Sequence, residues 1–165
     1  MAIADRRQNV IRLSWAQLHQ DVRNLAVQLA KKGPFHGLVA VARGGLVPAG
    51  ILARECGIRL VETVCIHSCE EELYAPEARV LKTFSRDEGL GWLVVDDMAA
   101  TGRTAALLRA MLPKAHIAAV YAKEQGMAYI DSFAVPLPQD SWLLPPWDSQ
   151  VQAPPRRAKK PASSS

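Results

Sequence analysis

Residues 93–104 read LVVDDMAATGRT, and this stretch decides the fold of the chain. An apolar run, Leu93–Val95, ends in two adjacent carboxylates, Asp96 and Asp97. A turn of small residues and a Thr-Gly-x-Thr sequence follow, and then the helical pattern of residues 105–112. This order predicts a buried strand, a tight loop and the N-terminus of a helix.

The loop after the two carboxylates is suited to bind an anion. It presents backbone N–H groups, hydroxyls and one guanidinium at the start of a helix. These groups belong to Thr101, Gly102, Arg103 and Thr104. The carboxylates of Asp96 and Asp97 suit sugar hydroxyls, a divalent cation, or both. Acidic residues also cap helices, but two in succession before Thr-Gly-x-Thr favour a site for a sugar phosphate with magnesium.

Apolar runs and helical patterns alternate along the rest of the chain. The predicted helices cover residues 14–32, from Pro48 to Gly57, and 104–112, and Ser14 with Gln17 suggests a capping box for the first. The predicted strands cover residues 38–42, 59–66, 92–95 and 117–122, with a short lid strand over 133–137. Residues 68–90 lack a sustained period and predict a long loop with short strands at most. The alternation predicts an α/β fold, with a doubly wound parallel sheet and a small C-terminal lid region.

Composition limits the organisation and the class of protein. The chain has 165 residues and a net charge of +4, which fits one domain over 1–150 that binds anionic substrates and no nucleic acid. Residues 151–165 are rich in Pro, Ser and basic side chains and predict a disordered, solvated tail, with no sign that it contacts a membrane surface. Three cysteines, without a signal peptide or an apolar run of membrane-spanning length, favour reduced thiols in the cytoplasm.

The candidate site residues all follow apolar runs. Arg43 and Gly44 come after one predicted strand, Asp96 and Asp97 after another, and Lys123 after a third. Ligands of doubly wound sheets bind at the carboxyl ends of the strands. We therefore expect these three elements to meet at one edge of the sheet.

The chain resembles the type I phosphoribosyltransferases in several segments. Residues 93–104 resemble the motif that binds phosphoribosyl diphosphate (PRPP), and residues 41–48, VARGGLVP, resemble the pyrophosphate loop. Residues 113–116, 121–123 and 138–148 are similar to the bacterial xanthine-guanine phosphoribosyltransferases. The resemblance runs from about Trp15 to Asp148. It implies a magnesium-dependent enzyme of purine salvage that transfers phosphoribosyl from PRPP to a 6-oxopurine, as a cytoplasmic homodimer or homotetramer.

The resemblance also implies roles for individual residues. Residues 101–104 would hold the 5′-phosphate, Asp96 and Asp97 the ribose, and Asp97 the magnesium ion. Arg43 and Gly44 would bind pyrophosphate, with a cis peptide bond between them. Ala100 stands at a position that, in the family, belongs to both the PRPP-binding and the purine-binding residues. The purine would meet the ammonium group of Lys123, the ring of Trp142 and the backbone carbonyl of Leu143.

Two positions depart from the family pattern. The family carries a proton-transferring Asp at the position of Ala100, and no residue of this chain is assigned as its catalytic base. The family also carries an arginine near Pro76, and Arg79 and Lys82 are the nearby cations. Alternatives therefore stay open: an altered base, a loop carboxylate, an introduced substitution, or a PRPP- or nucleotide-binding regulator with little catalysis. The loop carboxylates are those of Glu70, Glu71, Glu72 and Glu77.

Overall fold

The computed structural model describes residues 9–67 and 78–148 and shows an α/β fold. In chain order its elements are β1 (Val10–Arg12), α1 (Trp15–Leu29), β2 (Gly37–Ala42), α2 (Leu46–Glu55), β3 (Val61–His67), β4 (Arg79–Lys82), a 3-10 turn (Asp87–Gly89), β5 (Trp92–Ala99), α3 (Arg103–Met111), β6 (His116–Lys123), α4 (Glu124–Met127), β7 (Ser132–Leu137) and β8 (Trp142–Leu144). Within the described residues the main sheet has the strand order β4-β3-β2-β5-β6-β7, and only β4 runs antiparallel to its neighbour.

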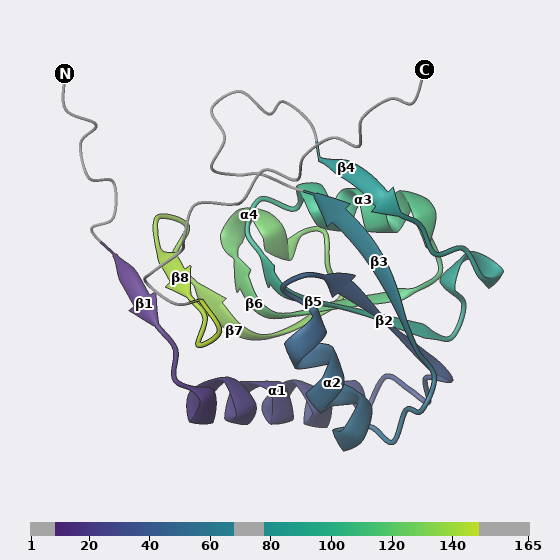
Figure 1. Ribbon diagram of the computed structural model, residues 1–165, viewed down its shortest axis with the longest axis horizontal. Helices are drawn as coiled ribbons and strands as arrows, with labels where there is room; N and C mark the ends of the chain where they lie inside the picture. Colours follow the sequence, from purple (N-terminus) through teal and green to yellow (C-terminus); the bar gives the residue numbers. More distant parts are fainter. Residues whose placement is uncertain (1–8, 68–77, 149–165) are drawn as a thin grey trace, which may run out of the picture.

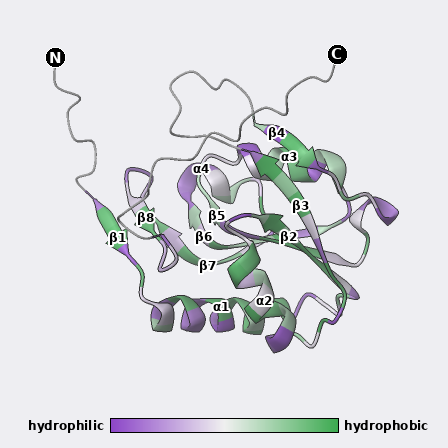
Figure 2. Cartoon of the chain, in the orientation of Figure 1, coloured by the Kyte–Doolittle hydropathy of each residue, from purple (hydrophilic) through white to green (hydrophobic). Residues whose placement is uncertain are grey.

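The main sheet is covered on both faces, which explains the nearly continuous apolar strands. Successive side chains of a strand point to opposite faces. Leu38 and Leu93 therefore pack in a cluster with α1 and α2, whereas Val39 and Val94 pack in a second cluster with Leu108 of α3. Figure 2 shows the central strands and α2 mainly in the hydrophobic colour, while α1 alternates between hydrophobic and hydrophilic residues. Burial on both faces is typical of parallel sheets.

The connections reverse direction in the middle of the main sheet. From β2 the chain passes through α2 to β3, toward one edge, and from β5 it passes through α3 to β6, toward the other. The helices α2 and α3 lie on opposite faces, as uniform right-handed crossovers require (Figure 1). This arrangement confirms the predicted doubly wound fold. The reversal between β2 and β5 marks the place where such folds bind their ligands.

Three differences between the predicted and the observed elements are larger or affect the architecture. The strand β5 continues to Ala99 rather than ending at Val95, because β6 pairs with it as far as Ala122. The helix α2 begins at Leu46, two residues before Pro48, because a proline is tolerated in a first helical turn where N–H groups lack partners anyway. The strand predicted for a lid is β7, which instead pairs with β6 as the edge of the main sheet.

The N-terminal strand β1 and the C-terminal strand β8 form a separate two-stranded parallel sheet. Val10 pairs with Trp142 and Arg12 with Leu144. The pairing joins segments about 130 residues apart in sequence, which local patterns do not reveal. The sheet therefore anchors the segment that carries Trp142 and Leu143.

A buried carboxylate fixes α1 against the main sheet. Ser14 Oγ accepts a hydrogen bond from the Gln17 N–H at 3.1 Å, as predicted for the cap. The Gln17 amide donates to Asp21 Oδ1 at 2.9 Å, so only half of the predicted capping box forms. The Tyr121 hydroxyl of β6 donates to Asp21 Oδ2 at 2.8 Å. Burial, as the largest cause, raises the pKa of the Tyr121 hydroxyl.

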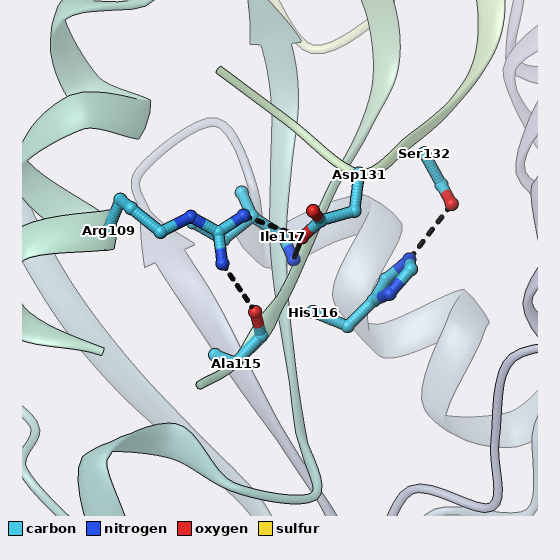
Figure 3. A network of polar contacts seen from close by, with 6 residues as sticks. All are labelled: Arg109, Ala115, His116, Ile117, Asp131 and Ser132. Carbon is cyan, nitrogen blue, oxygen red and sulfur yellow. Dashed lines mark hydrogen bonds and ion pairs between the residues drawn. The ribbon is translucent and has the colours of Figure 1, made fainter. Parts of the chain in front are cut away.

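A second polar network joins α3 to the start of β6 (Figure 3). Arg109 donates to the Ala115 carbonyl at 2.8 Å and to Asp131 Oδ2 at 2.6 Å. The Ile117 N–H donates to the same carboxylate oxygen at 2.7 Å. Because these contacts lie at the amino end of β6, they brace the sheet at the end opposite Lys123.

No helix among the described ranges is long and apolar enough to cross a membrane.

Candidate functional site

The acidic pair lies inside β5, close to its carboxyl end. Both side chains are half-buried. The Asp97 N–H donates to Asp96 Oδ1 at 2.9 Å, and the Met98 N–H donates to Asp97 Oδ1 at 2.9 Å. These local bonds hold each carboxylate close to its own backbone, and one oxygen of each makes no such bond among the described contacts.

Burial and mutual repulsion disfavour a negative charge on this pair. Burial, and then the charge of Asp97, hold the pKa of Asp96 well above its ordinary value. Burial also raises the pKa of Asp97, against the lowering effect of its hydrogen bonds. Within the described residues neither carboxylate takes part in an ion pair. Two partly buried carboxylates without a cationic side chain favour an external cation or hydroxyl donors.

The turn after β2 meets the acidic pair directly. A Cβ atom added to Gly44 would lie 2.3 Å from Asp97 Oδ1, so the backbone of Gly44 touches this carboxylate. A Cβ on Gly45 would lie 2.4 Å from the Val95 carbonyl oxygen and 2.7 Å from the Val41 carbonyl oxygen. Only glycine permits such close approach. The two segments predicted to meet at the edge of the sheet are therefore in contact.

The cis peptide bond in this turn joins Ala42 to Arg43. The sequence resemblance implied a cis bond between Arg43 and Gly44, which is one peptide too late. The Gly45 N–H donates to the Val41 carbonyl at 2.8 Å, so the turn begins immediately after Val41. The Arg43 side chain itself is exposed.

The predicted anion loop leads into α3. Gly102 has φ +82° and precedes the first helical residue, Arg103. Within the described residues no side chain caps the helix at Gly102. The N–H groups of a first helical turn have no partner inside the helix, and their dipoles favour an anion. Thr101 and Thr104 are half-buried beside this turn, and the Arg103 side chain is exposed.

Ala100 is buried at 7 % exposure, so a methyl group occupies the position where the resemblance implies a carboxylate. Its carbonyl oxygen accepts from Gln139 Nε2 at 3.4 Å. The proposed substitute carboxylates and Pro76 lie outside the described residues. Of the two nearby cations, Arg79 is exposed on β4, and Lys82 Nζ donates to Thr63 Oγ1 at 2.6 Å across to β3.

Lys123 ends β6 and is buried at 8 % exposure. Its Nζ donates to the Ser141 carbonyl at 2.7 Å. Ser141 directly precedes Trp142, so this bond joins the end of the main sheet to the β1–β8 sheet. An ammonium group has three donors, and one bond to Ser141 leaves donors for a ligand oxygen.

Trp142 and Leu143 form the wall next to Lys123. The Trp142 side chain is 38 % exposed, whereas the Leu143 side chain is buried in the core. The Trp142 N–H donates to the Asn9 carbonyl at 2.9 Å, and the Leu13 N–H donates to the Leu144 carbonyl at 3.0 Å. Because alternate residues of a parallel strand bond to the same neighbour, the Leu143 carbonyl is directed away from β1.

Sequence reasoning missed three residues that touch the site. Gln139 and Ser141 contact Ala100 and Lys123, and the ring of Tyr129 lies where a Cβ of Gly102 would be, 2.1 Å from one ring carbon. Their neighbours are distant in sequence, so no local pattern marks them.

In the part of the chain that the structure describes, no group of three or more His, Cys, Asp or Glu side chains is arranged to hold a metal ion.

Known proteins share this sequence and fold. Residues 14–155 match the phosphoribosyl transferase domain. The xanthine-guanine phosphoribosyltransferase of Nitratidesulfovibrio vulgaris strain Hildenborough is 50 % identical over 152 residues, which are 92 % of this chain and 93 % of that protein. The enzyme of the same name from Desulfotalea psychrophila is 45 % identical, over 91 % of this chain and 93 % of its own length.

The fold matches solved structures at much lower sequence identity. The crystal structure of a purine phosphoribosyltransferase from Pyrococcus horikoshii superposes with a TM-score of 0.72, at 20 % identity, over 87 % of this chain and 97 % of that one. The chain belongs to the phosphoribosyl transferase family, among the bacterial xanthine-guanine phosphoribosyltransferases.

Proposed function

We propose that the protein transfers the phosphoribosyl group of PRPP to a 6-oxopurine, namely xanthine, guanine or hypoxanthine, in purine salvage. The products are the nucleoside monophosphate and pyrophosphate. The observation that carries this proposal is the contact of the Gly44 turn with the Asp97 carboxylate, near the start of α3 at Gly102. Neighbouring strand ends thereby offer groups for pyrophosphate, ribose and phosphate. The shared name of the relatives favours this enzyme over a regulator that only binds nucleotides.

The PRPP half of the site positions three groups. Residues 101–104, with the N-terminus of α3, hold the 5′-phosphate through N–H groups and hydroxyls. Asp96 and Asp97 accept hydrogen bonds from the ribose hydroxyls. Arg43 and the Gly44 backbone receive the pyrophosphate, whose negative charge grows as the bond to ribose breaks. Fixed donors aimed at developing charge lower the barrier of such a displacement.

The acidic pair fits a magnesium ion that arrives with PRPP. The donors are carboxylate oxygens, which Mg²⁺ prefers, and they lack a cationic partner among the described residues. A site with few protein ligands is typical of Mg²⁺, which keeps waters and takes substrate phosphate oxygens. Asp97 is the residue that would hold it, directly or through water. When bound there, the ion would supply positive charge against the developing charge of the pyrophosphate.

The purine half of the site is built from Lys123, Trp142 and Leu143. The ammonium group of Lys123 donates to a 6-oxo group but is mismatched to the exocyclic amine of adenine. Trp142 stacks on the purine ring with its exposed face. The outward carbonyl of Leu143 accepts from a 2-amino group. Ala100 lies between the two halves and offers no proton acceptor to the purine.

The wider setting of the enzyme is proposed by resemblance. We place it in the cytoplasm as a homodimer or homotetramer, with residues 1–150 as the transferase domain. The family match over residues 14–155 supports a domain that fills nearly the whole chain. The tail predicted over 151–165 lies outside the described residues.

Steady-state turnover with a panel of bases tests this function. We expect guanine, xanthine or hypoxanthine to be converted faster than adenine. Lys123→Met should lower kcat/KM for the best oxopurine by about 10–100-fold, the scale of a hydrogen bond to a charged group. Lys114→Met is the control, because Lys114 is an exposed lysine paired with Glu88. Faster turnover of adenine than of guanine would make the assignment of the base wrong.

Binding of PRPP is expected to depend on magnesium. Isothermal titration should give a clearly lower affinity in EDTA than in excess Mg²⁺, because the phosphates then meet two uncompensated carboxylates. Asp97→Asn should weaken the magnesium-dependent part of the affinity. Asp140→Asn, an exposed position outside the site, should leave it unchanged. Equal affinity with and without the metal would remove magnesium from the account.

A further inference from the structure

The side chain of Gln139 bridges two segments that carry different halves of the site. Its Oε1 accepts from the Gln125 N–H at 3.1 Å, and its Nε2 donates to the Ala100 carbonyl at 3.4 Å. The first bond fixes the orientation of the amide, because only the oxygen accepts from an N–H. The donor end of the amide therefore faces Ala100.

Both partners of Gln139 are backbone groups at the ends of secondary structure. The pairing of β5 with β6 stops at Ala99, so the Ala100 carbonyl lies beyond the ladder while the residue itself is buried. The helix α4 starts after Lys123, which is its N-cap residue. Within the described residues, the Lys123 side chain makes no hydrogen bond that caps this helix. Buried backbone polar groups require partners, and this applies to the carbonyl of the buried Ala100. Gln125 is exposed, so its bond with Gln139 ties the start of α4 to the turn without satisfying a buried group.

Gln139 itself is held in a closed turn. The Ser141 N–H and the Ser141 hydroxyl both donate to the Pro138 carbonyl, at 3.1 Å and 2.6 Å. The same turn supplies the Ser141 carbonyl that accepts from Lys123. A rigid turn therefore presents Gln139 on one side and fixes the Lys123 ammonium on the other.

We propose that Gln139 is a positioning residue that couples the phosphate loop, through Ala100, to the purine-binding segment, through α4 and Lys123. This inference rests on the proposed function for the identity of the two ligands. It assigns to Gln139 no contact with substrate. The β5–β6 ladder sets the separation of the two strands as far as Ala99 and Ala122. Beyond it the amide ties Ala100 to the start of α4, so that ribose and purine meet in register. Small displacements of this kind affect catalysis strongly.

Two variants separate the two bonds of the amide. Gln139→Ala removes both, and we expect the KM values for PRPP and for guanine each to rise about three- to tenfold, the scale of one net hydrogen bond. Gln139→Glu keeps an oxygen for the Gln125 N–H but turns a carboxylate oxygen toward the Ala100 carbonyl. Amide hydrogen exchange should then accelerate in residues 100–104 with either variant, and in residues 124–127 only with Gln139→Ala.

The control is Asp140→Asn, which changes the neighbouring exposed residue of the same turn and should alter neither exchange nor KM. Unchanged exchange in both segments would overturn the proposal, as would a rise in the KM of one substrate alone. The exchange measurement needs no turnover. If the parent protein converted no base at all, the proposed function would fail while exchange still judged the role of Gln139.

Discussion

Replacing Ala100 by aspartate is expected to raise kcat for guanine or xanthine by about 10²-fold, within the usual range for a general acid–base group. Ala100 is buried, directly precedes Thr101, and its carbonyl accepts a hydrogen bond from Gln139. By the family resemblance, a carboxylate at this position serves the purine nitrogen that gains or loses a proton, which a methyl group does not serve. The affinity for PRPP should change little, because the groups proposed to bind the 5′-phosphate start at Thr101.

The substitution is checked by steady-state kinetics and by the pH profile of kcat. The variant should gain an ionisation that the parent lacks. Ala110→Asp adds the same charge on the exposed side of α3 and should leave kcat unchanged. If the parent enzyme is already fast and aspartate slows it, another carboxylate serves as the base. The loop glutamates at positions 70, 71, 72 and 77, outside the described residues, are candidates. Negligible activity with every base, before and after the change, would refute the transferase.

The central strands were predictable because burial on both faces requires continuous runs of apolar residues in the sequence. Leu93–Val95 is apolar throughout, and such a run indicates a covered parallel strand. The continuation of β5 through Asp96 and Asp97 was not predictable from this apolar run. It depends on hydrogen bonds to β6, and a pair of acidic residues carries no strand signal of its own.

The contact between Gly44 and Asp97 follows from topology. The carboxyl ends of parallel neighbours lie at one edge, so segments after two predicted strands must approach each other. The contacts of Gln139 and Ser141 and the pairing of β1 with β8 obey no such rule. They join positions that are distant in sequence, and their geometry is set only when the chain is packed. Local sequence patterns therefore located the acidic pair and did not reveal the contacts of Gln139 and Ser141 or the β1–β8 pairing that position Lys123 and Trp142.

Replacing Gly44 by alanine is expected to lower kcat/KM for magnesium–PRPP by about 10²-fold or more, the cost of a displacement near 1 Å in an active site. The new Cβ would lie 2.3 Å from Asp97 Oδ1 and 2.4 Å from Asp97 Oδ2. The clash falls on the end of a side chain rather than on backbone atoms, so rotation of the carboxylate can relieve it. The folded state should therefore lose little stability while the carboxylate leaves the position at which it is proposed to hold ribose and metal.

Two neighbouring glycines distinguish this effect from unfolding. At Gly45 a Cβ would meet the Val95 and Val41 carbonyl oxygens, which are backbone atoms of the two central strands, so alanine there should cost about 3 kcal/mol of unfolding free energy. At Gly50, in the exposed part of α2, a Cβ meets nothing within 4 Å, so alanine should add about 0.5–1 kcal/mol and leave activity intact. Urea unfolding and steady-state kinetics on the three variants measure both quantities. If Gly44→Ala retained full activity, contact between the turn and Asp97 would not define the site, because a displaced carboxylate would then serve equally well.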